Sequence, residues 1–203
     1  PTDIKISWFF LLNLIQYKSM LFEAQIIRFL QLNTGVGFIS FFQAVTLLGG
    51  LLGAFITFAI LFFNDKKLSL VFVLTFICAS VINYILKIII ARSRPFELYP
   101  DIVNYGNEDG YSMPSGHSMS AGLFVTFLFY LNIKSHSSKL TKTLCGIFLV
   151  LILGTIMLSR LVLGVHFLFD TIAGAIEGIL LAIIAILLYN YYQKKSKKEQ
   201  YQK

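Results

Sequence analysis

The sequence predicts an all-α fold: a polytopic membrane helical bundle of roughly five to six transmembrane helices, with a short or interfacial N-terminal helix. Of the 203 residues, 57% are hydrophobic and 15% aromatic, but only 13% are charged, and the mean hydropathy is +0.76. Soluble domains carry about 25% charged residues, so this composition indicates a membrane protein. Uncharged stretches recur along the whole chain and no linker divides it. Residues 1–203 are therefore predicted to form a single membrane-embedded domain.

The N-terminal segment, residues 1–34, has two open interpretations. Its apolar stretch "ISWFFLLNLIQY" is shorter than the roughly 20 residues that span a bilayer. The stretch "SMLFEAQIIRFLQL" that follows is amphipathic, with Glu23, Gln25 and Arg28 on its polar face. Such a pattern is typical of a helix that lies in the membrane interface. The segment is predicted to be either an interfacial helix or a short additional span.

Five longer stretches are predicted to span the membrane because each is free, or nearly free, of charged residues. They lie at residues 36–63, 68–90, 117–133, 142–162 and 167–192. The third is long enough only if its helix starts near His117, and the last is interrupted by Asp170 and Glu177 alone. Gly174 and Gly178 surround Glu177 in a spacing suited to close helix packing. Glu177 is therefore interpreted as a paired structural acid rather than a catalytic group.

Lysines between the predicted spans set the expected orientation. They gather in two loops and in the tail, at Lys66, Lys67, Lys134, Lys139, Lys142, Lys194, Lys195, Lys197 and Lys198. Cytoplasmic segments carry such an excess of positive charge. The basic tail at 193–203 is thus predicted to be cytoplasmic, and the polar loop at 91–114 faces outside. Nucleic-acid binding is the alternative for the tail, but a topology signal is the simpler interpretation. The expected partner is the bilayer, with no nucleic acid.

The two cysteines are not expected to bind a metal. Cys78 and Cys145 both fall inside apolar stretches and lack the spacing of metal ligands. They are predicted to be buried thiols, which behave as small hydrophobic groups.

The first cluster of functional candidates precedes the outer loop. Lys87 and Arg94 are seven residues apart, so both would lie on one side of a helix that persists to Pro95. Pro95 disfavours helical geometry in the residue before it, so the helix should end near Arg94. The alternative for both cations is that they extend towards lipid headgroups at a helix end.

The second cluster is "PSGH" at residues 114–117. Ser115 is a suitable N-cap, and Gly116 permits close approach of the backbone to a ligand. The free N–H groups at such a helix start bind anions, and His117 adds a titratable group there. A structural turn with an incidental histidine is the alternative.

The third cluster follows the next span. Ser159 and Arg160 precede His166, and Asp170 follows His166 by four residues. This spacing allows the two side chains to meet on one helical face. A carboxylate bonded to one imidazole nitrogen makes the other a better nucleophile. A buried histidine–aspartate pair with a purely structural role is the alternative.

Together these clusters place three cations, a helix N-terminus and two histidines on one predicted membrane face. Phosphoryl transfer through a covalent intermediate needs such a set, which neutralises charge, attacks phosphorus and donates a proton. The three motifs, Lys87-x6-Arg94-Pro95, Pro114-Ser115-Gly116-His117 and Ser159-Arg160-x5-His166-x3-Asp170, resemble the signature motifs of the type 2 phosphatidic acid phosphatase superfamily. The motifs cover residues 87–170, and residues 1–34 lie outside the resemblance.

The resemblance implies a role for each matching residue. His166 is expected to attack phosphorus and form a phosphohistidine, while Asp170 orients it. His117 is expected to protonate the leaving oxygen. Lys87, Arg94, Ser115, Gly116 and Arg160 are expected to hold the phosphoryl oxygens. No metal or other cofactor is expected.

The resemblance also implies a function and a location. The expected protein is a phosphatase of lipid phosphates or diphosphates in a bacterial inner membrane, with its active site on the extracytoplasmic face. Phosphatidylglycerophosphate, phosphatidic acid and undecaprenyl diphosphate are all open as substrates, as is the oligomeric state. An inactive lipid-binding or transport protein is an alternative, and a vanadate-dependent peroxidase is a weaker one. Tyr99, Tyr105 and Tyr111 in the outer loop would contact headgroups or anchor at the interface.

Overall fold

The computed structural model describes residues 2–201, with the side chains of residues 18–196 and 198–200. The described residues form helices and no strand, which confirms the all-α prediction. In chain order the helices are α1 (Thr2–Asn33), α2 (Val36–Thr46), the 3₁₀ turn η1 (Leu47–Gly49), α3 (Leu51–Asn64), α4 (Lys66–Ile90), α5 (Pro95–Leu98), α6 (Gly116–Lys134), α7 (Lys139–Val162) and α8 (Leu168–Tyr201).

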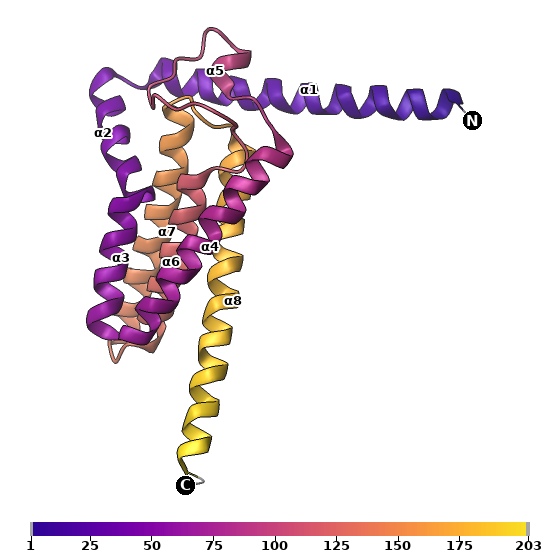
Figure 1. The fold of residues 1–203 in the computed structure, drawn as a ribbon. Helices are drawn as coiled ribbons and strands as arrows, with labels where there is room; N and C mark the ends of the chain where they lie inside the picture. The colour runs from indigo at the N-terminus through magenta and orange to yellow at the C-terminus, as the bar shows by residue number, and fades with distance from the viewer. Residues whose placement is uncertain (1, 202–203) are drawn as a thin grey trace.

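Helix α6 lies at the centre of the bundle. It packs against α3, α4, α7 and α8, and its most extensive contact is with α8. Helix α1 runs across one end of the bundle and projects beyond it, while the C-terminus extends from the opposite end (Figure 1). The small helix α5 and the loop that leads to α6 lie at the same end as α1.

Three glycines allow α6 and α8 to pack closely. A Cβ atom on Gly178 would lie 1.9 Å from the backbone oxygen of Met119. One on Gly174 would lie 2.2 Å from the backbone oxygen of Ser115. From the α6 side, one on Gly122 would lie 2.6 Å from the oxygen of Ala175. The close packing predicted from Gly174 and Gly178 is therefore present, and it fixes the start of α6 against the start of α8.

Among the described residues, α4, α7 and α8 are each long and apolar enough to cross a bilayer, and a bent pair formed by α1 and α2–η1 would be a fourth. The stretch at 36–63, predicted as one span, is divided by η1 into two shorter helices. The outer surface of the bundle is apolar: Leu51, Phe63 and Ile89 are 79%, 85% and 73% exposed. A surface of this kind suits contact with lipid chains.

Both cysteines lie on that outer surface. Cys78 and Cys145 are exposed free thiols, so the prediction that they are buried was wrong. Each sits in an apolar helix of the bundle, and a hydrophobic sequence does not distinguish a side chain facing lipid from one facing protein.

Helix α1 is attached to the bundle through polar groups. Arg28 forms a bidentate ion pair with Asp101, with Nε–Oδ2 and Nη2–Oδ1 distances of 2.5 and 2.9 Å. Gln31 donates to the carbonyls of Val103 and Val162. Glu23, predicted on a polar face, is fully buried against the bundle. Glu23, Arg28 and Gln31 of α1 therefore bind the rest of the protein, whereas Gln25 of the predicted polar face is exposed.

Helix α4 ends earlier than predicted. Its last residue is Ile90, and Ala91 follows in a left-handed conformation with φ 48°. Pro95 instead occupies the first turn of α5, and Arg94 before it is extended, with ψ 157°. The prediction of one helix up to Arg94 was therefore wrong, and Lys87 and Arg94 belong to different elements. Because α4 ends at Ile90, Arg92 lies outside the helix, and its side chain lies between the carboxylates of Glu23 and Asp170.

The packing of α6 on α8 can be tested with Gly178→Leu. The new side chain would overlap the backbone of α6, and overpacking of this kind costs about 1–3 kcal/mol or more. We expect a lower midpoint of thermal unfolding in detergent. The matched control is Gly154→Leu on α7, where an added Cβ meets nothing within 4 Å. Equal midpoints for the two variants would contradict the packing described.

Candidate active site

The residues of the three motifs gather at the end of the bundle crossed by α1. Four helix ends and two connecting segments supply them: Lys87 in the last turn of α4, Arg94 before α5, Ser115 and Gly116 with His117 at the start of α6, Arg160 in the last turn of α7, His166 before α8 and Asp170 in its first turn. The predicted constellation is thus assembled from segments far apart in the sequence.

Glu108 of the outer loop lies at the centre of this constellation. Its Oε2 is 3.0 Å from Nη1 of Arg94, and its Oε1 pairs with Nη2 of Arg160. Nδ1 of His117 is 3.6 Å from Oε1, and Nε2 of His166 is 3.8 Å from Oε2. One carboxylate therefore meets two arginines and both candidate histidines.

Basic side chains around Glu108 keep it ionised, and at neutral pH the charged ones are Arg94 and Arg160. Burial opposes its ionisation, but Arg160, the two histidines and Arg94 outweigh burial and lower the pKa of this carboxyl to about 2. At neutral pH the constellation therefore encloses an anion. The sequence offered no specific signal for this residue, which is one of several acids in a polar loop.

Arg160 has a hydrogen-bond donor to spare. Its side chain is 1% exposed, and Nη1 donates to Oγ1 of Thr46 over 2.5 Å. Its Nε is buried and has no partner among the described residues. Buried donors are almost always paired, so this N–H is available to a ligand with several acceptor oxygens.

Arg94 and Lys87 also fix the outer loop. Arg94 donates to the carbonyls of Asp109, Gly110 and Val165. Lys87 Nζ donates to the carbonyls of Tyr111 and Ser112, at 2.8 and 3.2 Å. These bonds hold the segment after Glu108 against the bundle, so the same cations shape the loop and line the site.

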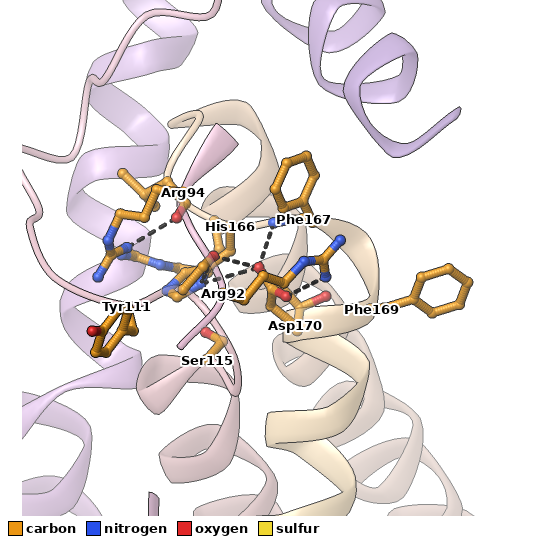
Figure 2. A network of polar contacts seen from close by, with 12 residues as sticks. Arg92, Arg94, Tyr111, Ser115, His166, Phe167, Phe169 and Asp170 are labelled. Atoms are coloured by element: carbon orange, nitrogen blue, oxygen red, sulfur yellow. Dashed lines mark hydrogen bonds and ion pairs between the residues drawn. The ribbon is translucent and has the colours of Figure 1, made fainter. Parts of the chain in front are cut away.

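His166 and Asp170 meet, but through a different geometry from the one predicted. His166 precedes α8 rather than lying on it, and its Nδ1 is 3.7 Å from Oδ2 of Asp170, beyond hydrogen-bond distance. The hydroxyl of Ser112 lies between them: it donates to Oδ2 over 2.5 Å and is 3.3 Å from Nδ1. His166 and Asp170 are labelled in Figure 2. The N–H of Phe167 also donates to Oδ2. The predicted i,i+4 contact is therefore present, but His166 lies outside the helix, because α8 begins only at Leu168.

The environment of His166 favours its neutral form. The side chain is 1% exposed. Burial lowers the pKa of His166 to about 4, against the opposing effect of the Asp170 carboxylate. A neutral imidazole has a free lone pair on one nitrogen, so the neutral form is the one that can attack an electrophile.

Ser115 is the N-cap of α6, as predicted. Its Oγ accepts from the N–H and the hydroxyl of Ser118, at 3.4 and 3.2 Å, and its own N–H donates to the carbonyl of Asp170 over 2.9 Å. The hydroxyl is therefore engaged in capping. Gly116 and His117 occupy the first turn, where backbone N–H groups have no helical partner. Amides of this kind at a helix start can bind an anion.

The break between α2 and α3 makes room for His117. A Cβ atom on Gly49 would lie 3.1 Å from Cβ of His117, and one on Gly50 would lie 3.8 Å from its Nε2. Thr46, just before η1, accepts a hydrogen bond from Nη1 of Arg160. The interruption of the first long apolar stretch, which sequence analysis missed, therefore shapes the site.

Glu177 and the three loop tyrosines lie around this cluster. Oε2 of Glu177 accepts from Asn83 over 2.8 Å, while its Oε1 is buried without a hydrogen-bond partner among the described residues. Tyr99 packs edge-on against Phe167, and Tyr105 and Tyr111 bind Gln43 and Lys87 through their carbonyls. Among the described residues no group of three His, Cys, Asp or Glu side chains is arranged to hold a metal ion.

Comparisons with known proteins identify the family of this chain. The model of the PAP2 superfamily matches residues 66–194. Phosphatidylglycerophosphatase B of Bacillus subtilis (strain 168) is 32% identical over 125 residues, 59% of this chain and 57% of that protein. The chain thus matches little more than half the length of this curated relative.

Two solved structures share the fold. The crystal structure of a transmembrane PAP2-type phosphatidylglycerolphosphate phosphatase from Bacillus subtilis superposes with a TM-score of 0.73 at 27% identity, covering 93% of this chain and 96% of that one. Aquifex aeolicus LpxE superposes with a TM-score of 0.68 at 26% identity, covering 80% and 93%. Since the family model covers more than half of the sequence and the same segment supplies the cluster around Glu108, the chain belongs to the PAP2 superfamily.

Proposed function

We propose that this protein is an integral membrane phosphatase that hydrolyses a lipid phosphate or diphosphate through a phosphohistidine, without a metal ion. The observation that carries the proposal is the set of groups around Glu108: two arginines and two histidines converge on one anion. A phosphoryl group has the same sign of charge and more acceptor oxygens, and it would also engage the free Nε of Arg160. The names of the relatives, phosphatidylglycerophosphatase B among them, support a lipid substrate.

In the proposed reaction His166 is the nucleophile. Its Nε2 faces the anion and its Nδ1 faces Ser112 and Asp170. The N–P bond forms as the bond from phosphorus to the lipid oxygen breaks, and Arg94 and Arg160 balance the charge on the phosphoryl oxygens. Lys87 and the amide of Gly116 complete this binding set, with Ser115 fixing the helix start.

His117 is the proposed proton donor. When it is protonated, it gives its proton to the departing lipid oxygen. The neutral imidazole then accepts a proton from the water that attacks the phosphohistidine, and phosphate leaves. A phosphate dianion in place of the Glu108 carboxylate carries more negative charge, which favours the protonated form of His117 in the bound state.

Three lipid classes fit the proposed chemistry: phosphatidylglycerophosphate, phosphatidic acid and undecaprenyl diphosphate. The matches to a phosphatidylglycerophosphatase favour the first. The proposed location is a bacterial inner membrane, with α1, α5 and the active-site loop at 91–114 on the extracytoplasmic side. In this orientation α1 lies in the outer interface, and the basic tail of the sequence, residues 193–203, is cytoplasmic.

The proposal predicts that His166→Ala abolishes phosphate release. We expect a loss of about 10⁴-fold or more, because a nucleophile cannot be replaced by binding alone. The assay measures phosphate released from a panel of the three lipids in detergent with EDTA present. Equal release by the wild type and by His166→Ala would refute the assignment, and a requirement for a divalent metal would refute the mechanism.

Glu108 must leave its place before a phosphoryl group can bind. Glu108→Gln removes the competing charge, so we expect KM for the lipid phosphate to fall by about 10-fold, with little change in kcat. The control is Asp109→Asn, because Asp109 meets Arg94 through its backbone carbonyl rather than its carboxylate. An unchanged or higher KM in Glu108→Gln would contradict this account.

The proposed orientation can be tested by cysteine labelling. In a chain whose Cys78 and Cys145 are replaced by alanine, Asn107→Cys should react with an impermeant thiol reagent added outside intact cells. Ser137→Cys, in the turn between α6 and α7, should react only after permeabilisation. The reverse pattern would invert the topology.

A further inference from the structure

Arg92 connects the candidate catalytic carboxylate to helix α1. Its Nη1 donates to Oδ1 of Asp170 over 2.5 Å (Figure 2). Its Nη2 donates to Oε1 of Glu23 over 2.6 Å. The guanidinium lies over the ring of Phe167, 4.3 Å from its centroid. The Arg92 side chain is 15% exposed and both carboxylates are fully buried, so the three charges form one enclosed network.

Glu23 uses its second oxygen at the start of α8. Its Oε2 accepts from the N–H of Phe169 over 2.9 Å, and this N–H lies in the first turn of α8. First-turn amides have no helical partner, and a carboxylate there is favoured by the helix dipole. Glu23 therefore binds both Arg92 and the helix that carries Asp170. It lies outside residues 66–194, so the family comparison does not account for it.

The two oxygens of Asp170 have different partners. Oδ2 accepts from Ser112 and from the N–H of Phe167, and it faces Nδ1 of His166. Oδ1 has Arg92 as its ion-pair partner. The guanidinium thus fixes the rotation of the carboxylate, and with it the direction in which Oδ2 points.

The network also sets the charge next to His166. Arg92 alone would neutralise Asp170, but its charge is shared with Glu23. Two carboxylates against one guanidinium give this network a net negative charge, and it lies on the Nδ1 side of the imidazole. Such a charge stabilises the positive charge that a histidine acquires when it is phosphorylated.

We propose that Arg92, itself held by Glu23 of α1, is a positioning residue that orients Asp170 towards His166. This inference rests on the proposed function, in which His166 is the nucleophile. Arg92 acts through Asp170 and does not contact the phosphoryl group. Its loss should therefore affect the chemical step rather than substrate binding.

The first measurement is steady-state kinetics of Arg92→Gln and Glu23→Gln with phosphatidic acid in detergent. We expect kcat to fall by about 10- to 100-fold, as for other residues that orient a reacting group through a second one. We expect KM to stay within about 3-fold of the wild type, because Arg94 and Arg160 are untouched. A change confined to KM would overturn the proposal. Arg92→Lys keeps a positive charge near Oδ1, so its kcat should be higher than that of Arg92→Gln. A kcat in Arg92→Lys as low as that of Arg92→Gln would also overturn the proposal.

The decisive measurement is a double-mutant cycle with Asp170→Asn. If Arg92 acts through Asp170, adding Arg92→Gln to Asp170→Asn should lower kcat by no more than about 3-fold further. If Arg92 had a purely structural role, the kcat of the double variant would be reduced by the product of the two single-variant reductions. That result would overturn the inference. A wild-type kcat in Asp170→Asn itself would refute the proposed function. Loss of kcat in Asp170→Asn with wild-type kcat in Arg92→Gln would refute the positioning role alone.

The matched control for α1 is Arg28→Gln. Arg28 anchors the same helix to the outer loop through Asp101, without reaching Asp170. We expect its kcat to remain within about 2-fold of the wild type, since an exposed ion pair contributes little to stability. A loss of kcat equal to that of Glu23→Gln would show that attachment of α1 alone matters, and would overturn the proposal. Thermal unfolding midpoints of all variants establish that the comparison is made between folded proteins.

Discussion

The site depends on a concentration of positive charge that requires an anion. Arg94 and Arg160 are 4% and 1% exposed at their side chains, and unpaired charges at such depth are costly. In this structure the carboxylate of Glu108 meets both arginines. Under the proposed function a phosphoryl group takes that place during the reaction. Affinity for phosphate and attraction for Glu108 thus have the same physical cause.

Close packing of the helices holds these charges in place. The close contact of α6 and α8 across Gly174 and Gly178 sets the first turn of α6 beside the first turn of α8. The N-terminus that offers free amides is thereby placed next to the segment that carries His166 and Asp170. The break at η1 adds Thr46 and space for His117. Substrate-binding groups therefore come from helix ends whose positions are fixed by packing in the apolar interior.

Sequence reasoning predicted the bundle and the residues of the motifs, because both have local signals. Long apolar stretches indicate helices in a membrane. His166 and Asp170 are ionisable residues at the edge of such a stretch, and residues of this kind are candidates for a functional role. It missed Glu108 and Ser112, because their importance comes from long-range contacts of a loop without periodicity. It placed Glu23 on a polar face without its partner, since that partner is 69 residues away. It also placed the end of α4 near Arg94 instead of Ile90, because a proline marks where a helix cannot continue but not where the helix ends earlier.

The central claim is that His166 carries the phosphoryl group during the reaction. The most direct test is rapid quenching of the enzyme with ³²P-labelled phosphatidic acid at alkaline pH, which preserves phosphohistidine, followed by mapping of the labelled peptide. The account predicts a transient, acid-labile label on the peptide that contains His166, and none in His166→Asn. Turnover without any labelled intermediate, or a label on His117 instead, would contradict it.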